Sequence, residues 1–138
     1  MTGPAIVPLL RVNQVTGTIV TAAMNVHSKL GPGLLESAYE ACLLRELAKQ
    51  GITVASQVVL PVVYDGETID LGYRIDLLVE DLVIVELKCV QAFNPIHEVQ
   101  LLSYLKLSGK NVGLLINFHV MHLRNGIKRL VNGKNWEK

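Results

Sequence analysis

Two charged side chains interrupt an otherwise apolar stretch of the sequence. The segment LVIVELKC (82–89) is typical of a β-strand and carries Glu86 and Lys88 among aliphatic residues. Side chains two residues apart in a strand share a face, so the carboxylate and the ammonium stand side by side. Leu82 and Ile84 share that face, and burying an unpaired ion there costs several kcal/mol. The pattern therefore indicates chemistry at this position, with a structural Glu–Lys ion pair as the alternative.

A second carboxylate comes shortly before this segment. Asp76 lies on the polar face of the alternating segment 68–79, which a short turn at 80–81 joins to the strand carrying Glu86. If the two strands are neighbours, Asp76, Glu86 and Lys88 converge on one side of the sheet. Two carboxylates are hard oxygen ligands suited to Mg²⁺ or Mn²⁺. The ammonium can orient or help deprotonate an attacking water and stabilise charge on a phosphoryl group. Taken alone, Asp76 is more typical of a solvated face.

Two expected helices add polar side chains. In GPGLLESAYE, Glu36 and Tyr39 are three residues apart on one helix face. In NPIHEVQLLSYLK, His97, Gln100 and Tyr104 form a polar stripe on a helix that is otherwise largely apolar. Either stripe by itself is more typical of a solvated helix face.

The spacing of apolar residues predicts the elements that must position these side chains. Helices are expected at about 12–30, 34–50 and 95–109, and strands at about 53–64, 68–79, 82–89, 111–117, 119–123 and 127–131. Asp65-Gly66 and Asn125-Gly126 predict hairpin turns. This order predicts an α/β sandwich in which helices flank a mixed β-sheet. Residues 1–11 are expected to be a loose lead-in to one domain at 12–138.

Several of these segments together resemble a known family. GLLESAY matches a GxxExxY motif at Gly33, Glu36 and Tyr39, and ID…ELK followed by HEVQLLSY resembles a minimal PD-(D/E)XK nuclease core. From about residue 12 to 131 the chain is similar to the GxxExxY proteins of the PD-(D/E)XK nuclease superfamily. The resemblance implies a restriction-endonuclease-like fold. The chain departs from the superfamily's name at Ile75, which stands in the place of the proline.

The resemblance also implies a role for each candidate residue. Asp76 and Glu86 would be the ligands of Mg²⁺ or Mn²⁺, and Lys88 would position or activate the attacking water. Glu36 would add an acidic group near the metal. Gln100 would support the site or contact the nucleic acid.

The implied function is that of a metal-dependent nuclease that hydrolyses phosphodiester bonds of DNA or RNA. Tyr39 and Tyr104 are expected to support its site. The alternative is a catalytically silent nuclease-fold module that binds nucleic acid or a protein partner. A homodimer and a larger nucleic-acid-processing complex are both compatible with the sequence.

Composition limits the class of protein further. The chain has 138 residues, of which 50% are hydrophobic and 18% charged, as is typical of a folded domain. Its net charge of +1 excludes a strongly basic arm as the basis of nucleic-acid binding. Charge is uneven, however, since 65–98 holds eight acidic and two basic residues, whereas 106–138 holds seven basic and one acidic residue. The basic segment fits a phosphate backbone, and it equally fits a solvated edge beside an acidic neighbour.

Other classes of protein find no support in the sequence. Cys42 and Cys89 form no CxxC pair, so they are expected to be small core residues rather than zinc ligands or a redox pair. No GxxxxGK[ST], GxGxxG or GxSxG motif occurs. The segment MTGPAIVPLL lacks a basic start, and the uncharged run 12–28 is too polar to span a bilayer. We therefore expect a cytoplasmic protein without a membrane partner.

Overall fold

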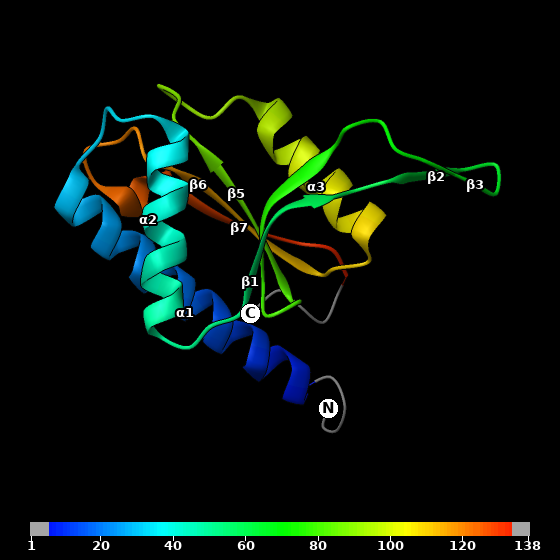
Figure 1. The fold of residues 1–138 in the computed structure, drawn as a ribbon, viewed down its shortest axis with the longest axis horizontal. Helices are drawn as coiled ribbons and strands as arrows, with labels where there is room; N and C mark the ends of the chain where they lie inside the picture. The colour runs from blue at the N-terminus through cyan, green and yellow to red at the C-terminus, as the bar shows by residue number, and fades with distance from the viewer. Residues whose placement is uncertain (1–5, 134–138) are drawn as a thin grey trace.

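The computed structural model describes residues 6–133, and a central β-sheet between two layers of helices is its main feature (Figure 1). Helices α1 (Ile6–Leu30) and α2 (Glu36–Lys49) cover one face of this sheet, and helix α3 (Pro95–Ser108) covers the other. The α/β sandwich expected from the sequence is confirmed. None of the helices in the described part of the chain is long and apolar enough to cross a membrane.

Five strands form the central sheet. Their order is β1 (Val54–Val59), β4 (Arg74–Val79), β5 (Val83–Lys88), β6 (Val112–Asn117) and β7 (Ile127–Val131). Strands β5 and β6 are parallel, with α3 as the crossover between them, and every other neighbouring pair is antiparallel. The sheet is therefore mixed, as the order of elements predicts.

Alternation along β5 divides the core into two layers. Val83 and Leu87 are fully buried among side chains of α1 and α2, whereas Ile84 is fully buried against α3. Because successive side chains of a strand point to opposite faces, Glu86 and Lys88 belong to the α3 layer. Strand β5 thus buries aliphatic side chains on both faces, and its two charged side chains, Glu86 and Lys88, lie at its C-terminal end.

Helix α1 begins earlier than the sequence suggests. It starts at Ile6, so residues 6–11 of the expected loose lead-in are helical, and residues 1–5 lie outside the described residues. Its end is as predicted, because Gly31 has φ +67° and its N–H donates to the carbonyl of His27 at 2.7 Å. Such a left-handed residue is the usual end of a helix.

Residues 61–73, which we call the arm, differ from the two long strands expected there. The arm projects from the body and contains a separate hairpin of β2 (Val62–Tyr64) and β3 (Glu67–Ile69). The turn between its strands is confirmed: Asp65 and Gly66 have φ of +54° and +77°, as a type I′ turn requires.

Two local features divide the expected strands at the ends of the arm. Pro61 has no N–H to donate and separates β1 from β2. On the return, the Asp70 carboxylate accepts a hydrogen bond from the N–H of Gly72 at 2.9 Å, and Gly72 has φ +85°. This local turn separates β3 from β4 and redirects the chain into the sheet.

The connection from β6 to β7 also differs from the prediction. Residues 119–123 form no strand, and Asn125-Gly126 is no hairpin turn; bends lead instead into a short 3₁₀ helix, η2 (Leu123–Gly126). The side chain of Asn117 accepts a hydrogen bond from the N–H of His119 at 3.1 Å, which turns the chain out of the strand direction. Hydropathy alone does not report such a side-chain contact with the backbone.

Both cysteines lie where the sequence analysis places them. Cys42 and Cys89 are half-buried and pack against the core on the side of α1 and α2, and both are free thiols. In the described part of the chain, neither belongs to a group of three or more His, Cys, Asp or Glu side chains that could hold a metal ion.

Candidate active site

The strands β4 and β5 separate at the predicted carboxylates. Their regular pairing ends at Leu77 and Val85, and the next pair in register is Asp76 with Glu86. There the N–H of Asp76 donates to Oε2 of Glu86 at 2.9 Å, and the N–H of Leu87 donates to Oδ2 of Asp76 at 2.9 Å. Each carboxylate thus takes the place of a backbone acceptor. The two strands are held apart around a pair of acidic side chains.

Strand β1, the other neighbour of β4, also pairs irregularly opposite Asp76. Strand β1 pairs with β4 at Ser56 and again at Val58, but Gln57 between them has φ +52° and no partner in the described ladder. Asp76 stands opposite Gln57 in this register, so regular pairing is interrupted on both sides of Asp76. The interruption leaves its side chain at an opening in the sheet.

Burial makes the carboxylate pair electrostatically unfavourable in the absence of a cation. Glu86 is only 5% exposed, while Asp76 is half-buried. Burial, and next the negative charge of Asp76, raise the pKa of Glu86 to about 8, although the N–H of Asp76 and the charge of Lys88 favour the carboxylate. A divalent cation would relieve this repulsion.

Helix α2 adds two further carboxylates. Glu36 lies in its first turn, where partial desolvation of the carboxyl group and then the charge of Asp76 raise its pKa, whereas the charge of Lys88 lowers it. Glu40 lies one turn later and accepts a hydrogen bond from Nε2 of Gln57 at 3.1 Å; burial raises the pKa of its carboxyl group. Glu40 is not among the residues expected from the sequence, although its four-residue spacing from Glu36 was a signal.

Lys88 supplies the positive charge of the site. It is half-buried at the end of β5, in register with Asn117 of β6, and it lowers the pKa of both Glu36 and Glu86. Within residues 6–133 no hydrogen bond or ion pair engages its Nζ atom, so the alternative of a structural Glu86–Lys88 ion pair is not formed. The ammonium is therefore available to a water or a substrate.

Helix α3, which covers the face of the sheet opposite α1 and α2, adds further polar side chains near the carboxylates. Nε2 of Gln100 donates to the hydroxyl of Tyr104 at 3.2 Å, and the ring of Tyr73 lies 6.1 Å from that of Tyr104. Burial and then the charge of Glu86 raise the pKa of Tyr104. His97, the third member of the polar stripe, instead caps the start of α3.

Tyr39 lies in the hydrophobic core and not beside the charged side chains of the site. It is fully buried and stacks on Phe118 at a ring distance of 4.5 Å. Its hydroxyl donates to the carbonyl of Gly31 at 2.5 Å and accepts from the N–H of Leu34 at 3.1 Å. Tyr39 thereby fixes the loop that leads into Glu36, so it supports the site through that loop.

We expect Tyr39→Phe to lower the free energy of unfolding by about 1–2 kcal/mol, because it leaves two partly buried backbone groups without their partner. Thermal unfolding followed by circular dichroism measures the change. Tyr64→Phe is the matched control, since Tyr64 is 73% exposed, and it should change stability by less than about 0.5 kcal/mol. Equal effects of the two substitutions would contradict the anchoring role of the Tyr39 hydroxyl.

The residues present fit a divalent metal ion that keeps part of its water shell. Hydrogen bonds occupy one oxygen of each carboxylate, which leaves Oδ1 of Asp76 and Oε1 of Glu86 without one to another described residue. In the described part of the chain no three or more His, Cys, Asp or Glu side chains are grouped closely enough to hold a metal ion by themselves. One or two carboxylates, with waters and substrate phosphates, are the usual ligands of Mg²⁺.

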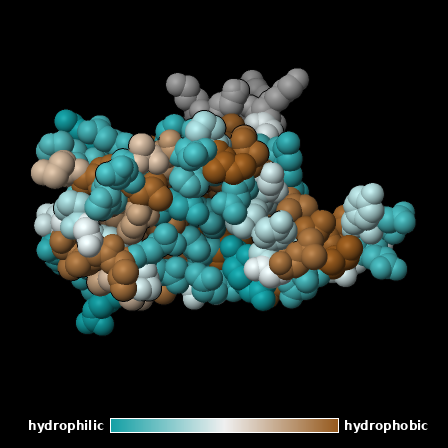
Figure 2. All heavy atoms as spheres, turned by 90° about the horizontal axis from the view of Figure 1, so that it is seen from above, coloured by the Kyte–Doolittle hydropathy of each residue, from teal (hydrophilic) through white to brown (hydrophobic). Residues whose placement is uncertain are grey.

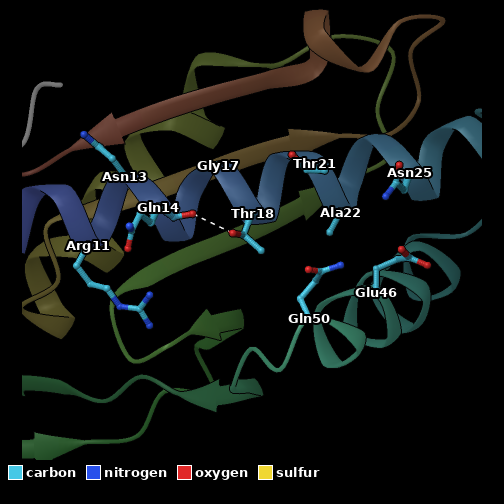
Figure 3. A pocket seen from close by; sticks show the side chains of 10 residues that line it. All are labelled: Arg11, Asn13, Gln14, Gly17, Thr18, Thr21, Ala22, Asn25, Glu46 and Gln50. Carbon is cyan, nitrogen blue, oxygen red and sulfur yellow. Dashed lines mark hydrogen bonds between the residues drawn. The ribbon is translucent and has the colours of Figure 1, made fainter.

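The structure also contains a groove between α1 and α2, which is separate from the candidate site. This groove encloses about 640 Å³ and is lined mainly by polar side chains of α1, such as Gln14, Thr18 and Asn25, facing Glu46 and Gln50 of α2 (Figure 3). None of the candidate residues lines it. The chemistry indicated by the carboxylates is therefore separate from this groove.

The fold and the site together define a class of protein: an α/β sandwich whose separated strands present two carboxylates and a lysine. The family model described as the PD-(D/E)XK nuclease superfamily matches residues 13–130. The chain therefore belongs to the PD-(D/E)XK nuclease superfamily. No curated protein and no solved structure gives a match.

Proposed function

We propose that this protein is a metal-dependent nuclease that hydrolyses phosphodiester bonds of DNA or RNA with Mg²⁺ or Mn²⁺. The observation that carries the proposal is the carboxylate pair of Asp76 and Glu86, held in the gap between two strands beside the unengaged ammonium of Lys88. A purely structural site would pair its buried charges internally, because an uncompensated buried ion destabilises the fold.

Each residue has a role that follows from its position. Asp76 and Glu86 would hold the metal ion, which when bound supplies a Lewis acid that polarises the phosphoryl group. Lys88 would orient the attacking water and stabilise the negative charge that develops on the phosphoryl oxygens. Its ammonium is suited to both tasks because no carboxylate among residues 6–133 forms an ion pair with it.

The side chains from the two helices would complete the site. Glu36, whose carboxyl pKa responds to Asp76 and Lys88, would accept a hydrogen bond from water near the metal. Gln100 and Tyr104 are joined by a hydrogen bond and would contact the nucleic acid or fix the position of Glu86. Glu40 holds Gln57 and so would position α2, and with it Glu36, against the sheet.

Calorimetric titration with Mn²⁺ tests this assignment without requiring a substrate. We expect the wild-type protein to bind Mn²⁺ and Asp76→Asn to bind it at least about tenfold more weakly, because a ligand charge is lost. Asp65→Asn is the control, since Asp65 lies in the exposed turn of the arm and asparagine also suits that conformation.

The titration also separates the nuclease from the silent module. If Asp76→Asn bound Mn²⁺ as tightly as the wild type, the ligand assignment would be wrong. If the folded wild-type protein bound no Mn²⁺, the silent nuclease-fold module would be the better account.

A further inference from the structure

The arm exposes apolar side chains that the body of the protein does not cover. Among its residues, Val63 is 65% exposed, Tyr64 is 73% exposed and Leu71 is 60% exposed. Figure 2 shows hydrophobic surface where the arm extends from the body. A two-stranded hairpin is at best marginally stable in water, and exposed apolar patches mark interaction sites. The arm is therefore expected to gain stability from a contact with another chain.

The charge of the arm excludes a nucleic acid as this contact. Asp65, Glu67 and Asp70 are its only charged residues, so the arm is uniformly negative. Carboxylates repel a phosphate backbone, whereas protein surfaces that bind nucleic acids are positively charged. A protein surface is the partner that fits.

One edge of the hairpin is open and uncharged. In a two-residue hairpin the residues that flank the turn, here Tyr64 and Glu67, exchange the inter-strand hydrogen bonds. Alternation then directs the backbone N–H and C=O of Val63 away from β3, toward the open edge of β2. This edge is formed by Val62, Val63 and Tyr64, with none of the charges that usually protect an edge strand from pairing.

We propose that two copies of this chain associate through their β2 edges, antiparallel and related by a two-fold axis at Val63. Val63 would exchange both hydrogen bonds with Val63 of the second copy, and Val62 would face Tyr64 of that copy. Pro61 and the turn at Asp65 limit the pairing to this register, because Pro61 lacks an N–H and the turn leaves the strand conformation. A four-stranded antiparallel sheet, β3-β2-β2-β3, results.

Charge favours a second copy as the occupant of this edge. In the register centred on Val63, Asp65 of one copy stands opposite Pro61 of the other, so no carboxylate on the β2 edge faces another. The acidic Glu67 lies on β3, on the outer side of the four-stranded sheet. The contact is isologous, as in most dimers, and its formation does not depend on nuclease activity.

Analytical ultracentrifugation of the full chain over a range of concentrations tests the proposal. We expect a reversible dimer whose Kd rises about tenfold or more in Val63→Lys, because two ammonium groups would then face each other across the axis. Thr68→Lys is the matched control. Thr68 pairs with Val63 in the hairpin and shares its face, but it lies on the β3 edge, so its Kd should stay near that of the wild type.

Mixing two variants provides the sharper test. Val63→Lys and Val63→Glu should each dimerise at least about tenfold more weakly than the wild type, whereas an equimolar mixture should form heterodimers, because the two-fold axis places lysine against glutamate. A wild-type protein that stayed monomeric at every concentration would overturn the proposal. So would equal effects of Val63→Lys and Thr68→Lys, or a mixture that did not associate. Circular dichroism confirms that each variant is folded.

Discussion

Lys88→Ala should reduce metal-dependent cleavage by about a hundredfold to ten-thousandfold while the protein remains folded. The loss is large because this substitution removes the group that orients the water and stabilises charge on the phosphoryl oxygens. The fold should tolerate it, since within residues 6–133 no hydrogen bond or ion pair engages Lys88. Initial rates on an oligonucleotide substrate measure the effect.

Two comparisons make the result for Lys88 specific. Lys106→Ala removes an exposed ammonium from α3 and should leave the cleavage rate within about twofold of the wild type, as a surface change outside the site does. Mn²⁺ binding should persist in Lys88→Ala, because both carboxylates remain. Cleavage by Lys88→Ala at the wild-type rate would exclude Lys88 from the chemistry.

The metal-free protein should become less stable as the pH rises from about 4.5 to about 8. Burial raises the pKa of Glu86 from 4.5 to about 8 in the folded protein, so the folded state binds a proton that the unfolded state has released over this range. Stability therefore falls as the pH rises through it and levels off above it. A shift of this size corresponds to roughly 3–5 kcal/mol of stability.

Glu86→Gln isolates this contribution. Glutamine can still accept the hydrogen bond from the N–H of Asp76 but cannot ionise, so the difference in free energy of unfolding between variant and wild type should grow from pH 5 to pH 8 in EDTA. Saturating Mg²⁺ should restore stability to the wild type and have little effect on Glu86→Gln. Urea unfolding curves at several pH values provide the measurement. Parallel pH profiles of the two proteins would contradict the buried carboxylate pair.

The apolar pattern predicted each strand of the central sheet because each of these strands contributes apolar side chains to a core layer. It misled in the arm, where Ile69, Leu71 and Tyr73 alternate as if buried but are 36%, 60% and 42% exposed. Alternation reports which side chains share a face and contains no information on what covers that face. The expected continuous strand through 68–79 was wrong for this reason.

The site could be predicted to the extent that it depends on strand register. Asp76, Glu86 and Lys88 lie on adjacent strands joined by a short turn, so their proximity follows from local pairing. Glu40 and Gln57 could not be placed in this way, because their contact depends on how α2 packs against β1. The position of Tyr39 in the core likewise depends on Phe118, which is distant in the sequence.

The central claim is that Asp76 and Glu86 form a metal-dependent phosphodiesterase site, and cleavage itself tests it most directly. Wild-type protein and Asp76→Asn are incubated with single- and double-stranded DNA and RNA in Mg²⁺, in Mn²⁺ and in EDTA. The account predicts that the wild type cuts at least one of these substrates only with metal, and that Asp76→Asn does not cut it. Cleavage by Asp76→Asn at the wild-type rate, or cleavage that persists in EDTA, would contradict the account.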